Sequence, residues 1–67
     1  MTPQTFYLSW SDGVCRMAHG STLDDAEEDA ECSSMVTNRM SCSILNHNYT
    51  LVSRVVHRNG QYVTERV

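Results

Sequence analysis

Three cysteines and three histidines are the side chains of this 67-residue chain best suited to metal or nucleophilic chemistry. Cys15 and His19 have the spacing of half a zinc site. A structural zinc site needs four ligands that converge, however, and His47 and His57 are expected in or near separate turns. We therefore predict no metal site, and the sequence indicates no other cofactor.

The cysteines are also poor candidates for a catalytic nucleophile. Cys32 is expected on the acidic face of a helix, where neighbouring carboxylates would raise the pKa of a thiol and suppress the thiolate. Cys42 alternates with Ile44 in an expected strand, which is typical of a core position. The chain contains no glycine-rich phosphate-binding loop. We predict that the protein is not an enzyme.

Carboxylates dominate one segment of the chain. The stretch STLDDAEEDAECSS, residues 21–34, carries six acidic side chains and no lysine or arginine. An exposed helix usually carries basic residues four positions from its acids, because like charges at that spacing destabilise it. One interpretation is a solvated face that keeps a small protein soluble. The other is a binding surface, and the sequence leaves both open.

Composition limits the kind of partner that such a surface could bind. Eight acidic and five basic residues give a net charge of -3, which disfavours direct binding to nucleic acid and favours a basic protein surface. A hydrophobic fraction of 40% with one proline indicates one folded domain over residues 1–67. An odd number of cysteines and no secretory signal favour a cytoplasmic location. No apolar run is long enough to span a membrane, so we expect no membrane partner.

A hairpin near the N-terminus is the first element that positions these side chains. Asp12-Gly13 is typical of a two-residue turn, because both residues tolerate positive φ angles. Taken literally, this turn pairs Trp10 with Cys15 on the inner face of the ribbon. It places Arg16 on the outer face.

A helix is predicted from about Thr22 to Ser34. Thr22 is the expected N-cap, with Asp25 three residues later as its capping partner, and Ser21 with Asp24 is the next-best pair. At 3.6 residues per turn, one stripe of the helix is small and apolar and should pack on a sheet; it comprises Leu23, Ala26, Ala30 and Ser34. The acids fan across the opposite face, which leaves Glu27 at the border.

Three further segments predict strands from their β-branched and aromatic residues: RMSCSIL, YTLVSRVVHR and QYVTERV, residues 39–45, 49–58 and 61–67. Asn59-Gly60 predicts a second two-residue turn, which pairs Val56 with Val63. The inward face of that hairpin is left open, and a bulge at Val55-Val56 is one solution. The expected fold is therefore α+β, with element order β-β-α-β-β-β. One helix should cover one face of an antiparallel sheet of four or five strands.

Two short segments resemble small phage-encoded proteins: AHGSTLDDAEEDA (residues 18–30) and RNGQYV (residues 58–63). Among these, the chain is similar to anti-CRISPR proteins of the type I systems, small α+β domains that bind the Cas surveillance complex and block DNA recognition. GSTLDDA (residues 20–26) also resembles the antitoxin subunit of HicAB-type systems, which blocks a partner protein. Both resemblances imply an inhibitor that works by binding. The first implies a phage or mobile-element protein that binds a host complex, and the second implies an antitoxin-like module that neutralises a cognate toxin.

Two rival surfaces could make that contact. The first is the acidic helix face, which we expect to occupy a lysine- and arginine-rich surface that normally holds phosphates: Asp24, Asp25, Glu28, Asp29 and Glu31. The second is the uncovered sheet face with aromatic and arginine anchors: Tyr7, Arg16 and Tyr62. The remaining functional alternative is a structural or assembly protein that forms a homodimer through the same uncovered sheet face.

Overall fold

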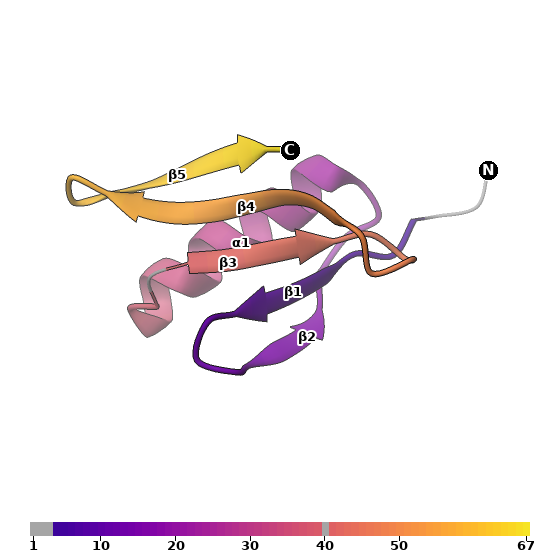
Figure 1. The fold of residues 1–67 in the computed structure, drawn as a ribbon, viewed down its shortest axis with the longest axis horizontal. Helices are drawn as coiled ribbons and strands as arrows, with labels where there is room; N and C mark the ends of the chain where they lie inside the picture. Colours follow the sequence, from indigo (N-terminus) through magenta and orange to yellow (C-terminus); the bar gives the residue numbers. More distant parts are fainter. Residues whose placement is uncertain (1–3, 40) are drawn as a thin grey trace.

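One helix and five strands make up the part of the chain that the structure describes, residues 4–39 and 41–67 of a computed structural model. In chain order the elements are β1 (Tyr7–Trp10), β2 (Cys15–Met17), α1 (Leu23–Thr37), β3 (Ser41–Leu45), β4 (Leu51–Arg58) and β5 (Gln61–Arg66). The strands form one antiparallel sheet in the order β2-β1-β3-β4-β5, and α1 lies across one face of it (Figure 1). The predicted α+β fold is confirmed, with five strands.

The core lies between α1 and the sheet. Ala26 and Ala30 are fully buried, and their small side chains let the helix lie close on the strands. Their partners come mainly from β1, β3 and β4, and the buried apolar cluster comprises Phe6, Leu8, Trp10, Ala18, Ala26, Ala30, Cys42, Ile44 and Val55. Leu23, at the first turn of α1, packs against this cluster.

Both ends of α1 are capped by local hydrogen bonds. The Thr22 hydroxyl accepts from the backbone N–H of Asp25 at 3.1 Å, which confirms the predicted N-cap. The helix ends at Thr37, one turn beyond the predicted Ser34. Asn38 ends it in the left-handed conformation at φ 56°, which a short polar side chain tolerates.

The first hairpin has a different turn from the one predicted. The N–H of Trp10 donates to the carbonyl of Val14 at 2.8 Å, so Trp10 pairs with Val14 and not with Cys15. The loop therefore contains three residues, Ser11, Asp12 and Gly13, and Gly13 adopts a φ of 96°. An Asp-Gly pair suits a three-residue loop and a two-residue turn equally. In the three-residue loop, the left-handed glycine closes a type I turn.

This difference of one residue reverses the faces of β2. Leu8 pairs with Arg16 and Ser9 with Cys15, so Arg16 shares the helix side of the sheet with Leu8. Cys15 is exposed instead of lying beside Trp10 in the core. The predictions of an inward Cys15 and an outward Arg16 were both wrong.

The second hairpin forms as predicted. Val56 pairs with Val63 across the Asn59-Gly60 turn. No register shift occurs at Val55, which is fully buried against the helix side. The shift lies instead between β3 and β4, after Ile44. The inward face of this hairpin is therefore the face of Val55, and the predicted strand at residues 39–45 is observed as β3, with Met40 outside the described residues.

Candidate functional site

The acidic side chains of α1 are partly neutralised by an arginine from β5. Arg66 donates from Nε and Nη2 to the two carboxylate oxygens of Glu27, each at 3.0 Å, and from Nη2 to Asp24. The hydroxyl of Ser53 donates to the same Glu27 carboxylate at 2.7 Å. Glu27 is only 8% exposed, and the hydrogen bonds from Arg66 lower its pKa despite burial. This acid therefore anchors α1 to the sheet.

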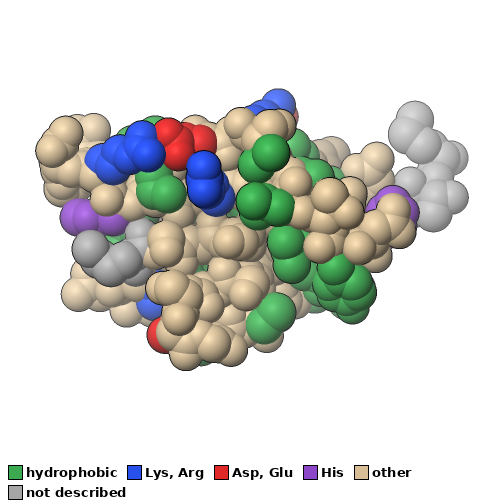
Figure 2. Space-filling model, in the orientation of Figure 1, with side chains coloured by type: hydrophobic (Ala, Val, Ile, Leu, Met, Phe, Trp, Pro, Cys, Tyr) green, Lys and Arg blue, Asp and Glu red, His purple; other side chains and the backbone are tan. Residues whose placement is uncertain are grey.

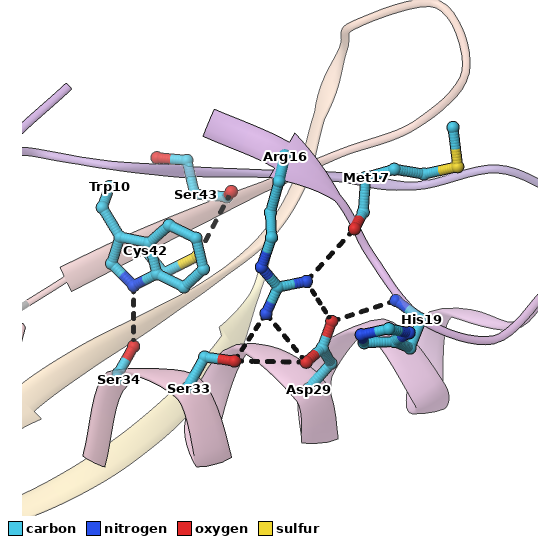
Figure 3. Close-up of polar contacts among 9 residues, drawn as sticks. All are labelled: Trp10, Arg16, Met17, His19, Asp29, Ser33, Ser34, Cys42 and Ser43. Carbon is cyan, nitrogen blue, oxygen red and sulfur yellow. Dashed lines mark hydrogen bonds and ion pairs between the residues drawn. The ribbon is translucent and has the colours of Figure 1, made fainter. Parts of the chain in front are cut away.

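A second arginine holds α1 from the opposite edge of the sheet. Arg16 of β2 donates from Nη1 and Nη2 to the two carboxylate oxygens of Asp29, at 2.8 and 3.0 Å (Figure 3). Asp29 also accepts the backbone N–H of His19 and the hydroxyl of Ser33. The bidentate Arg16 contact is the main reason why the pKa of Asp29 falls to about 2.

Trp10 lies at the centre of this contact between hairpin and helix. Its indole N–H donates to the buried hydroxyl of Ser34 at 2.9 Å (Figure 3). The guanidinium carbons of Arg16 and Arg39 each lie 5.4 Å from the ring centroid, within cation–π range. Arg39 in turn donates to Asp12 of the hairpin loop at 2.7 Å. These contacts make the β1–β2 hairpin and the second half of α1 one packed unit.

Three acids of α1 have no cationic partner within residues 4–39 and 41–67. Among the described residues, the ion pairs include neither Asp25 nor Glu28 nor Glu31. Glu31 accepts the hydroxyl of Thr64 at 2.8 Å, a neutral partner. Asp24 belongs to an ion pair, but its side chain is 86% exposed. Of the predicted acidic face, Asp24, Asp25 and Glu28 are exposed, Glu31 is half-buried, and Asp29 belongs to the contact with Arg16.

An open hollow of about 430 Å³ lies beside these acids, between α1 and the loop that precedes it. Its lining combines carboxylates with one imidazole and one thiol: His19, Gly20, Asp25, Glu28, Asp29 and Cys32. Within the described residues, however, no three His, Cys, Asp or Glu side chains converge closely enough to hold a metal ion. The hollow is a surface concavity of negative charge.

The predicted sheet-face surface is divided between two sides of the sheet. Tyr7 lies on the uncovered face, where its ring stacks on Tyr49 with centroids 4.8 Å apart. Arg16 lies on the helix side, as described above. The hydroxyl of Tyr62 donates to the carbonyls of Ser34 and Arg39, which places it on the helix side as well. These three side chains therefore do not form one surface.

Sequence reasoning missed Tyr49, which replaces Arg16 and Tyr62 as the neighbour of Tyr7. Tyr49 was expected only as the start of a strand, but it lies in the turn before β4 and is 67% exposed. The sequence signal that could have located Tyr49 is the turn signature Asn46-His47-Asn48, since the predicted turn could have been extended by one residue to include it.

The three cysteines differ in their exposure. All three are free, with Cys15 and Cys32 exposed and Cys42 buried. Burial raises the pKa of the Cys42 thiol to about 11, so it stays protonated at neutral pH. The structure therefore offers no activated thiolate at Cys42.

Comparison with known proteins adds no relative. No protein family matches the chain, and no curated protein or solved structure was found to be similar to it. Within the described residues, no helix has the length and apolar character to cross a membrane. The function must therefore be argued from the surfaces described above.

Proposed function

We propose that this protein is an inhibitor that acts by binding, and that α1 presents its acids to a lysine- and arginine-rich surface of a nucleic-acid-handling protein complex. Occupying that surface prevents the complex from binding nucleic acid. The resemblance of residues 18–30 and 58–63 to anti-CRISPR proteins favours a type I Cas surveillance complex in a host cytoplasm as the target. A phage or mobile element is then the source of the protein.

The division of the acids on α1 supports this proposal. Asp24, Glu27 and Asp29 have arginine partners, so their presence is explained by the attachment of the helix to the sheet. Asp25, Glu28 and Glu31 have no such partner among the described residues, and they repel one another at i, i+3 spacing. Their cost to helix stability is offset in a complex with a basic surface.

The spacing of these three carboxylates is close to that of phosphates. From Asp25 to Glu31 there are six steps along the helix, which is about 9 Å at a rise of about 1.5 Å per residue. One strand of DNA carries a charge about every 3.4 Å along the helix axis. Three carboxylates over this length therefore present a density of negative charge similar to that of one strand, and they would suit the same basic groove.

The test is a binding and competition assay with a purified type I surveillance complex. Asp25→Asn, Glu28→Gln and Glu31→Gln are combined in one variant, which removes the unpaired acids and leaves Asp29 and Glu27 in place. The matched control raises the net charge by the same amount with lysines away from α1, as Asn48→Lys, Thr50→Lys and Gln61→Lys. All three control positions are exposed.

We expect the acid variant to lose binding at least tenfold while the lysine control, of equal net charge, loses much less. Binding of the unmodified protein should weaken steeply with salt, because several charge pairs form at once. If the acid variant retains full affinity and Tyr7→Ala abolishes it, the uncovered sheet face makes the contact instead. If the unmodified protein does not bind, the surveillance complex is not the target.

A further inference from the structure

The uncovered face of the sheet carries an apolar row that crosses four of its strands. Met17, Tyr7, Leu45 and Leu51 are successive cross-strand neighbours on β2, β1, β3 and β4. Tyr49 stacks on Tyr7 and extends the row outward. Met17 is 60% and Tyr49 67% exposed. Figure 2 looks onto this face and shows hydrophobic side chains gathered toward the right, away from the β4–β5 turn.

The ring of Tyr49 is held over this row by an unfavourable backbone conformation. Tyr49 has a φ of 61°, which bulky residues rarely adopt. The side chain of Asn46 fixes the turn by accepting the N–H groups of Asn48 and Thr50 at 2.9 and 3.0 Å. A tyrosine at a position that suits glycine or asparagine indicates that its ring serves a purpose beyond the turn itself.

The other end of the same face is basic. Arg54 and Arg58 are 55% and 59% exposed, and they share the single carboxylate of Glu65. Arg54 lies 3.8 Å from Glu65, whereas Arg58 donates to it at 2.6 Å, so Arg54 is the less neutralised cation. Between the two ends lie the small side chains of Ser9 and Ser43, which allow close approach. In Figure 2 the basic side chains lie over β4 and β5.

We infer that this face binds a second copy of the chain in an isologous dimer. A two-fold axis that lies between the two sheets, parallel to them and perpendicular to the strands, reverses the strand direction of the partner, so the aromatic end of each copy lies over the basic end of the other. The rings of tyrosines and guanidinium groups attract each other. The two-fold rotation brings the aromatic end of each copy against the basic end of the other, so this contact forms twice. The face is thus complementary to itself. The inference is independent of the proposed target.

The size of the face predicts a weak dimer. Five strands about 4.8 Å apart and side chains about 6.8 Å apart along a strand give a face of about 20 by 20 Å. The area of this face is thus about 400 Å², about half of the roughly 800 Å² that each partner buries in a stable interface. A Kd on the order of 100 µM is expected, and a measurement at a single low concentration would miss the dimer.

Sedimentation equilibrium from about 10 µM to about 1 mM tests this inference, since that range brackets a Kd on the order of 100 µM. Tyr49→Asn is the diagnostic variant, because asparagine tolerates the left-handed conformation and folding should be retained or improved. Arg54→Glu tests the basic end. Val36→Gln is the control, because Val36 is 85% exposed but lies on α1, behind the sheet.

The unmodified protein and Val36→Gln should form dimers with the same Kd. Tyr49→Asn and Arg54→Glu should each raise the Kd at least tenfold, with unchanged or higher melting temperature for Tyr49→Asn. A protein that stays monomeric at the highest concentration overturns the inference. So does a dimer that survives both sheet-face substitutions or is lost in Val36→Gln.

Discussion

Replacing Asp29 with asparagine tests whether the acids of α1 hold the fold together. The Asp29 carboxylate accepts two hydrogen bonds from Arg16, one from the backbone of His19 and one from Ser33. An asparagine of the same shape keeps one acceptor oxygen and places an N–H₂ group against the guanidinium. The substitution should therefore lower the free energy of unfolding without removing apolar contacts.

The pKa of Asp29 gives the size of the effect. A fall from the ordinary 3.8 to about 2 is worth about 2 kcal/mol, at about 1.4 kcal/mol for each pH unit. The Arg16 side chain is 36% exposed, so solvent screening reduces the expected loss to about 1–2 kcal/mol. For a domain of this size, that loss lowers the melting temperature by about 5–15 °C.

The pH dependence separates this ion pair from a general packing defect. Because the folded-state pKa of Asp29 is depressed, its contribution is fully present above the unfolded pKa and is lost as pH falls through about 2. The stability difference between the wild type and Asp29→Asn should therefore stay constant from neutral pH to about pH 5 and shrink at lower pH.

Urea denaturation followed by the fluorescence of Trp10, the single tryptophan, measures both quantities. A double-mutant cycle with Arg16→Gln isolates the pair. Glu28→Gln is the matched control on the same helix, with no hydrogen bond to lose among those described, and should change stability by less than about 0.5 kcal/mol. Equal stabilities of Asp29→Asn and Glu28→Gln would refute the role of Asp29. A stability difference between the wild type and Asp29→Asn that does not change with pH would refute it as well.

Three further outcomes are expected. Arg66→Gln should lower the urea midpoint clearly more than Arg54→Gln, because only Arg66 pairs with a buried carboxylate on α1; equal midpoints would contradict this. A maleimide should label Cys15 and Cys32 in the native protein and Cys42 only after unfolding; rapid native labelling at all three sites would show that the core opens readily. A reductant or a metal chelator should shift the melting temperature by no more than about a few degrees, and a larger change would reveal a disulfide or metal that stabilises the fold.

The two hairpin turns show what the sequence could and could not decide. Asn59-Gly60 formed the expected two-residue turn, and the pairing of Val56 with Val63 followed directly. Asp12-Gly13 did not, because aspartate also suits the type I turn that a left-handed glycine closes in a three-residue loop. One residue of difference then moved Arg16 to the opposite face of β2.

The acidic helix shows a second limit of prediction from the sequence, which is set by the distance between interacting residues along the chain. The cap at Thr22 and the small stripe of Ala26 and Ala30 are local features, and both were predicted correctly. The partners of the acids lie 13 to 42 residues away on β2 and β5. Only the strand order, which places these two strands at opposite edges of the sheet, shows that their arginines can reach the helix.

This arrangement changes how a uniformly acidic helix is best interpreted. Within the sequence window, six acids without a basic residue suggest one charged surface. In the fold, Arg16 and Arg66 divide the acids into those that pair with an arginine of the sheet and those that have no such ion pair in the part of the chain that the structure describes. A variant that neutralises Asp29 together with Asp25 and Glu28 would weaken the fold and the surface at once, and its loss of activity would carry no information about binding. The unpaired acids must be changed alone, because only their removal separates stability from recognition.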